Sequence, residues 1–85
     1  MVAMIALNRR EALRRFWDAG YDNENRLRDA AAILDRVPQP AAGYYYPADI
    51  DRFINMDRIE RTLAMPGWNP GYRANLEIEL NRLRG

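Results

Sequence analysis

The chain has 85 residues, a formal net charge of +1 and no cysteine. Its length permits one domain with a modest core, because folding at this size buries about 60% of the surface that the unfolded chain exposes; the lack of cysteine excludes disulfide bridges. Its 13 basic and 12 acidic residues nearly balance, which gives no general electrostatic argument for a nucleic-acid partner.

The longest apolar run lies at the amino-terminal end. Residues 1–7 are too few to span a bilayer. Arg9 and Arg10 follow this run, whereas a signal peptide carries its positive charges before the apolar segment. We therefore expect a cytoplasmic protein that does not enter a membrane.

The first helix is predicted over residues 2–19. Its apolar stripe consists of Val2, Ile5, Ala6, Leu13, Phe16 and Trp17. Asn8 would make a good N-cap, but a start there would place Arg9 and Arg10 at the positive end of the helix dipole, so the earlier start is preferred. Gly20 is expected to end the helix.

The densest basic cluster in the chain consists of Arg9, Arg10, Arg14 and Arg15. The main interpretation is a solvated helix face with local ion pairs. Arg9 lies near the centre of the apolar stripe, where an unpaired charge is costly. Its head is expected to reach water or a carboxylate near the helix end; the alternative is an ion pair with a partner chain or with Asp57.

A second helix is predicted over residues 23–36. Asp22 or Asn23 can cap it, and the residues on its apolar face are Leu27, Ala30, Ala31 and Leu34. The helix ends near Val37, because a residue before proline is pushed out of the helical region. Residues 38–46 then form an extended connector.

Two further helices have clear start signals. Pro47 suits the first turn of a helix over 47–64, whose apolar residues cover more than half of its circumference. Asn69 as a cap and Pro70 at the first helical position predict the last helix over 70–84. We therefore expect an all-α fold: a single domain, 1–85, formed by a small bundle of about four helices around a central helix at 47–64, with no sheet. The expected core consists of Phe16, Trp17, Leu27, Leu34, Ile50, Phe53, Ile54, Leu76, Leu80 and Leu83.

The residue inventory excludes most catalysis. Histidine, cysteine, lysine and serine are absent, and Thr62 supplies the only aliphatic hydroxyl. The absent residues carry most acid–base and covalent chemistry. Glu77 and Glu79 point about 160° apart on a helix and cannot share one ion, and no calcium or magnesium spacing is present. We expect no enzymatic activity, no cofactor and no metal.

Aromatic and arginine residues flank the helix predicted over 47–64. If residues 44–46 are extended, Tyr45 faces away from Tyr44 and Tyr46, so at least one ring should stay exposed. Tyrosine, tryptophan and arginine dominate binding hot spots. The candidate partner-binding residues are Tyr44, Tyr45, Tyr46, Arg52, Trp68, Tyr72 and Arg73. The alternative is that the rings only seal the ends of the bundle.

Three single apolar residues point away from the predicted stripes. These are Met4, Leu7 and Ile78. They are candidates for a self-association surface, since small helical domains with little core often gain stability by forming oligomers.

The favoured function is a non-catalytic protein-binding module. A small regulator or inhibitor of phage or mobile-element type, or an assembly subunit, fits the small size and the lack of catalytic residues. Its partner would be a protein, and a homo-oligomer is possible.

One segment resembles a known family. Residues 43–54, GYYYPADIDRFI, are similar to the wing-to-helix segment of MerR-like and excisionase-type winged-helix DNA-binding proteins. Those families place a helix-turn-helix with polar recognition residues just upstream, where this chain has an alanine-rich helix. The resemblance implies an alternative function as a DNA-binding accessory protein, which a β-wing across residues 44–46 would favour.

Overall fold

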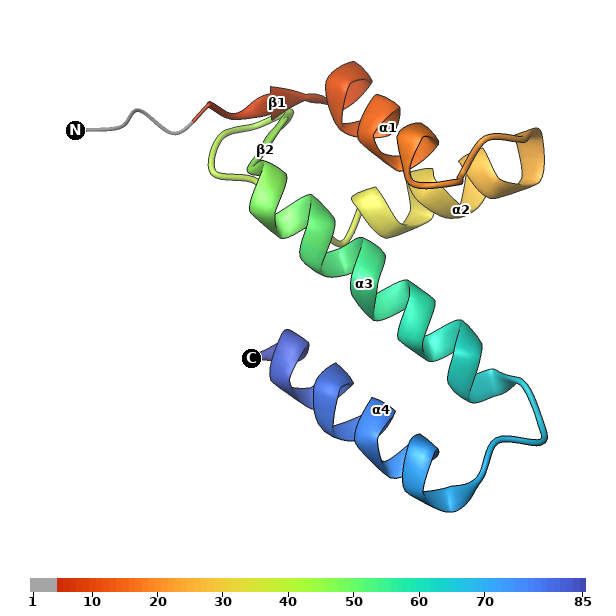
Figure 1. Cartoon of the computed structure of the whole chain (residues 1–85). Helices are drawn as coiled ribbons and strands as arrows, with labels where there is room; N and C mark the ends of the chain where they lie inside the picture. The colour runs from red at the N-terminus through yellow and green to blue at the C-terminus, as the bar shows by residue number, and fades with distance from the viewer. Residues whose placement is uncertain (1–4) are drawn as a thin grey trace. The chain divides into compact units, whose positions relative to one another are not determined.

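The computed structural model describes residues 5–85, and 67% of these are helical (Figure 1). The elements follow one another as β1 (Leu7–Asn8), α1 (Arg9–Asp18), α2 (Glu24–Leu34), β2 (Tyr44–Tyr45), α3 (Pro47–Ala64) and α4 (Pro70–Arg84). Four helices dominate the fold, so the predicted all-α class is confirmed. The chain forms two compact units, Met1–Asp51 and Arg52–Gly85, and the boundary falls within α3.

Helix α1 begins at Arg9, and the prediction of a helical start at residue 2 is wrong for the described residues 5–8; residues 2–4 lie outside the described part. Asn8 is the N-cap, and its side-chain oxygen accepts a hydrogen bond of 2.9 Å from the backbone N–H of Glu11. Glu11 in turn accepts from the Asn8 backbone N–H at 3.2 Å. This capping box satisfies two donors, which outweighs the two arginines that follow at the positive end of the dipole.

A short antiparallel ladder joins β1 to β2, so the prediction of no sheet is also wrong. Leu7 is opposite Tyr45, and Asn8 is opposite Tyr44. An isolated bridge between Ala41 and Tyr44 closes the turn that precedes β2. Residues 38–46 are therefore not simply an extended connector, because they fold back and pair with the strand before α1.

The turn between α1 and α2 is fixed by an aromatic side chain. Gly20 has φ 107°, a conformation that glycine adopts without a steric penalty. Tyr21 follows it and is 1% exposed. Its ring meets that of Phe16 edge-on, with centroids 5.2 Å apart, and the guanidinium of Arg26 lies 4.3 Å from its centroid. Tyr21 therefore holds the end of α1 against the start of α2.

The core of the first unit differs in part from the predicted one. Phe16, Leu34 and Ile50 are buried as expected, but Trp17 is 46% exposed. Ala12 and Phe16 define the buried line of α1, and Trp17 projects about 100° away from Phe16 around the helix. The other buried residues of this unit are Ala12, Tyr21, Ala30, Ile33, Val37 and Tyr45.

The second unit is a hairpin of two antiparallel helical segments. Ile54 and Leu80 are buried in it, whereas Phe53, Leu76 and Leu83 are only partly buried. The start of α4 confirms the prediction, because the Asn69 side chain accepts from the backbone N–H of Tyr72 at 2.7 Å. The bounds of α3 and α4 agree with the predicted helices at 47–64 and 70–84.

Arginines link the two helices of this hairpin. Arg52 donates to the Leu83 carbonyl at 2.9 Å, and Arg73 donates to the Leu63 carbonyl at 2.8 Å. Arg84 forms an ion pair with Glu60 at 3.1 Å. The first two contacts satisfy carbonyl groups near the ends of helices, which lack partners within the helix.

Candidate functional site

The exposed face of α2 is polar and belongs to the first unit, as does the β1–β2 ladder. Asn25, Arg28, Asp29 and Ala32 are exposed there, and Arg36 is exposed in the turn that follows α2. At 100° per residue these positions lie within about 50° of one line, opposite the buried residues of the same helix. Ala32 is at the centre of this face, so its small side chain lets another surface approach the helix closely. We call these five residues the α2 face.

Most charges near the α2 face are locally balanced. Arg28 pairs with Glu24 at 3.3 Å, and Arg26 pairs with Asp29 at 2.8 Å. Exposed pairs of this kind contribute about 0–1 kcal/mol, so a stronger anion can replace the carboxylate. The Arg36 side chain forms no hydrogen bond or ion pair with any residue from 5 to 85. Arg28 and Arg36 are therefore the cations that this face offers to a ligand.

The turn before β2 is compact and exposed. Gln39 accepts a hydrogen bond of 2.7 Å from the backbone N–H of Gly43, and Tyr44 donates its N–H to the Ala41 carbonyl at 2.9 Å. Gly43 has φ 79°, which the tight reversal requires. Residues 38–44 are exposed throughout. The β1–β2 ladder ties this turn to the residues that begin α1.

A two-bond ion pair ties α1 to the first turns of α3 within the first unit. Arg15 donates to Asp51 through two nitrogens, at 2.8 and 2.7 Å. The Arg15 guanidinium lowers the pKa of Asp51, mainly through these hydrogen bonds, and the pKa of Arg15 is raised for the same reason. Arg9 forms a longer contact of 3.4 Å with Asp35 rather than with Asp57, which pairs with Arg61.

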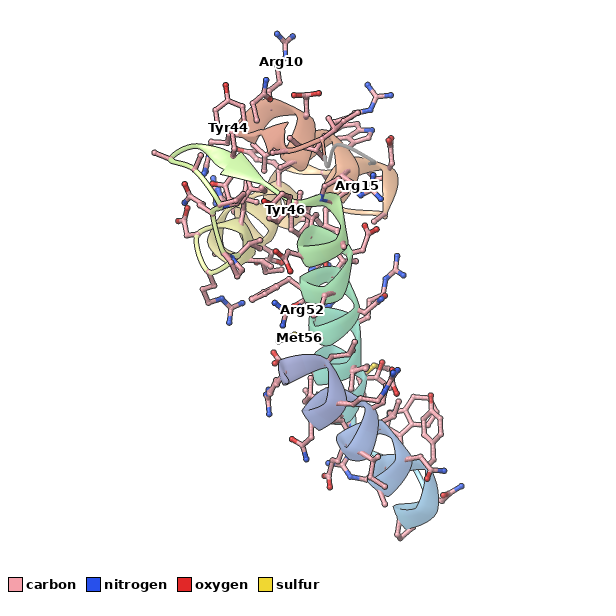
Figure 2. The ribbon with its side chains drawn as sticks, turned by 90° about the vertical axis from the view of Figure 1, so that its left-hand side faces the viewer. Arg10, Arg15, Tyr44, Tyr46, Arg52 and Met56 are labelled. Carbon is pink, nitrogen blue, oxygen red and sulfur yellow. The ribbon has the colours of Figure 1, made fainter. Side chains whose placement is uncertain are left out.

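The three predicted tyrosines have three different environments. Tyr45 is 3% exposed and belongs to the core, Tyr46 is partly buried, and Tyr44 is 47% exposed. The alternation expected of an extended segment is therefore confirmed, and one ring stays accessible (Figure 2). Whether Tyr44 contacts a partner remains a prediction.

The remaining predicted partner-binding residues lie in the hairpin of the second unit. Trp68 and Tyr72 pack together with ring centroids 5.0 Å apart and stay 39% and 41% exposed. The Trp68 indole N–H donates to the Thr62 carbonyl at 2.8 Å. Arg73 bonds to a carbonyl at this end of the hairpin, whereas Arg52 does so at the other end. These residues therefore do not form one site.

The described candidate self-association residues belong to different units. Leu7 is partly buried in β1, and Ile78 is 66% exposed on α4 in the other unit. Met4 lies outside the described residues. Self-association through these side chains remains untested.

Two searches of residues 5–85 bear on other functions. None of the helices in this range is long and apolar enough to cross a lipid bilayer. The same range holds no group of three or more histidine, cysteine, aspartate or glutamate side chains placed to bind a metal ion.

Comparison of the chain with protein-family models, curated proteins and solved structures finds no match. The features of the chain that point to a function are therefore the α2 face, the turn at 38–44 and the exposed aromatic side chains.

Sequence reasoning missed the α2 face as a site. The helix predicted over residues 23–36 is characterised in the sequence only by its apolar face, which consists of Leu27, Ala30, Ala31 and Leu34. The available signal was the exposed spacing of Asn25, Arg28 and Ala32 at three- and four-residue intervals, on the side opposite the leucines.

Proposed function

We propose that the first unit binds duplex DNA, with α2 as the recognition helix and the turn at 38–44 as a wing. The observation that carries this proposal is the pairing of β1 with β2. With this pairing, the elements follow one another as strand β1, helix α1, a turn, helix α2, the proposed wing and the returning strand β2. The resemblance of residues 43–54 to winged-helix proteins implies this arrangement. In helix-turn-helix proteins the second helix enters the major groove.

The residue types on the α2 face support this proposal. Arginine reads guanine and asparagine reads adenine through paired hydrogen bonds at the base edges, and an alanine side chain contacts the thymine methyl group. Arg28, Asn25 and Ala32 supply these three groups within one exposed stripe. Arg36, at the end of the same stripe, is suited to a phosphate contact.

The charge balance sets the expected strength of binding. Residues 1–51 contain seven arginines against eight carboxylates, so no general positive field attracts DNA. Affinity must come from a few local contacts, and non-specific binding should be weak. With Arg36 as the phosphate contact and Arg28 on a base edge, the logarithm of the affinity should fall against the logarithm of the salt concentration with a slope of about −1.

The test is selection of duplex DNA from a random pool with the full chain, followed by fluorescence anisotropy on the enriched sequence. Arg28→Ala should weaken binding about tenfold or more, because one paired base contact is worth about 1–3 kcal/mol. Arg82→Ala is a matched control, since Arg82 is also exposed and also pairs with a glutamate one turn away. Failure to enrich any sequence, or equal losses in the two variants, contradicts the proposal.

A protein partner at the second unit is the second candidate function. Met65, Trp68 and Tyr72 are large apolar side chains that stay exposed near the turn between α3 and α4. Such residues are typical of binding hot spots. Capture of a defined protein by the full chain after nuclease treatment would support this function, provided that Trp68→Ala abolishes capture without lowering the melting temperature.

A further inference from the structure

An open hollow of about 720 Å³ lies along α1 in the first unit, and the proposed DNA-binding function does not use it. Its apolar part is formed by Leu7 of β1, Leu13 and Trp17 of α1, and Leu27 of α2. Leu13 and Leu27 are partly buried, whereas Trp17 is 46% exposed. These four side chains make an apolar strip that runs beside α1.

Trp17 has the properties of a binding anchor. Its indole N–H has no hydrogen-bond partner among residues 5–85, in contrast to that of Trp68, which donates to the Thr62 carbonyl. A tryptophan with an exposed ring and an unused donor contributes both apolar area and one polar contact when a partner covers it.

The charged side chains around the hollow indicate which charge a bound partner should carry. Glu11 is used in the capping box, Arg14 pairs with Asp18 at 3.1 Å, and Arg15 is held by Asp51. Arg10 also lines the hollow and forms no ion pair with any described residue. Its side chain extends outward from α1 (Figure 2). The one lining charge without a described partner is therefore the positive charge of Arg10, which lies beside the apolar strip.

The geometry points to an acidic amphipathic helix of a partner protein as the occupant, with Trp17 as its apolar anchor and Arg10 as its ion-pair partner. From Arg10 to Trp17 the strip follows α1 for about 10 Å at the helical rise per residue. A partner helix segment of about two turns, with apolar residues at i, i+3 or i+4, and i+7, matches this length. A carboxylate at one end would then meet Arg10.

Other occupants fit the hollow less well. A nucleic acid would leave the leucines and Trp17 against a polar sugar-phosphate backbone. An added β-strand would gain few backbone hydrogen bonds, because β1 contains only Leu7 and Asn8. An apolar strip bordered by an unpaired arginine favours a helix that is apolar on one side and acidic at its edge.

The test uses the full chain carrying Trp68→Phe, so that Trp17 is the sole tryptophan and reports on the hollow. The probe is a synthetic helical peptide of about fifteen residues with leucines at i, i+3, i+4 and i+7 and glutamates at the edges of that face. A second peptide has lysines in place of the glutamates. We expect the glutamate peptide to shift the emission of Trp17 to shorter wavelength saturably, and the lysine peptide to bind at least about tenfold more weakly.

A charge exchange at residue 10 makes the test specific. Arg10→Glu adds a negative charge to the first turn of α1, where the helix dipole favours it, so lost binding will not reflect unfolding. This variant should bind the lysine peptide better than the glutamate peptide. The proposal is overturned if the glutamate peptide leaves Trp17 emission unchanged, if Arg10→Glu does not reverse the preference, or if a duplex or single-stranded oligonucleotide shifts Trp17 and the peptide does not.

Discussion

The ion pair between Arg15 and Asp51 gives the most exact prediction about stability. It joins α1 to the first turns of α3 through two hydrogen bonds of 2.8 and 2.7 Å, but its side chains are 42% and 48% exposed. Solvent therefore screens the pair, and we expect its coupling energy to be about 0.5–1 kcal/mol at pH 7. Asp51→Asn should lower the melting temperature by about 2–6 °C, as expected for a domain of this size.

The pH dependence of this coupling follows from the lowered pKa of Asp51. Its pKa is lowered from the ordinary 3.8 in the folded chain, so the stabilisation is present above that value and is lost as the pH falls through the folded pKa. Thermal unfolding of the wild type, Arg15→Gln, Asp51→Asn and the double variant, followed by circular dichroism from pH 7 to pH 2, measures the coupling. We expect it to weaken toward the acid end of this range as the Asp51 carboxylate takes up a proton.

Two outcomes would refute this reasoning. A coupling that is already near zero at pH 7 would mean that the two side chains do not hold each other in solution. A coupling that persists unchanged in acid would mean that it does not depend on the Asp51 carboxylate. Glu79→Gln is the control, because Glu79 pairs with Arg82 within one helix, and its pKa is lowered by that hydrogen bond. Both side chains of this pair belong to α4, so the pair does not hold two elements together. Its coupling energy should be smaller than that of Arg15 with Asp51.

Three further predictions concern α1 and its strand. Asn8→Ala should cost about 1 kcal/mol in the free energy of unfolding through loss of the capping box, and an unchanged melting temperature would contradict the start of α1 at Arg9. Phe16→Ala should cost about 3–5 kcal/mol, whereas Trp17→Ala should change the melting temperature little; equal losses would show that Trp17 is in the core. Tyr45→Ala should destabilise the chain strongly and Tyr44→Ala should not, and the opposite order in thermal melts would contradict the register of the β1–β2 ladder.

The two later helices could be predicted because their signals are local. Pro47 and Pro70 suit the first turn of a helix, and Asn69 caps the helix that Pro70 begins. Gly67, with φ 98°, allows the reversal between α3 and α4. Each of these effects depends on a few neighbouring residues, so the bounds of α3 and α4 follow from the sequence alone.

The start of α1 was missed because two local effects were weighed incorrectly. The dipole disfavours Arg9 and Arg10 near the amino-terminal end of a helix, but only by a few tenths of a kcal/mol each at an exposed site. The capping box formed by Asn8 and Glu11 contributes more. The longer helix also shifted the predicted apolar stripe, which placed Trp17 in the core although the buried line runs through Ala12 and Phe16.

The β1–β2 ladder could not be predicted from periodicity. Each strand has two residues, too few for an alternating pattern, and the partners lie far apart in the sequence. The ladder forms because Tyr45 and Leu7 gain burial when the turn at 38–44 folds back. The α2 face was missed for the same reason, since its proposed role depends on the turn that the ladder holds in place.

The most direct test of the proposed function is a titration of the isotope-labelled full chain with the enriched DNA duplex, followed by the backbone amide chemical shifts. Binding through α2 and the wing predicts that the largest changes fall in residues 24–36 and 38–44, while the amides around Trp68 and Tyr72 stay unchanged. Changes concentrated in Arg52–Gly85, with none on the α2 face, would contradict the account.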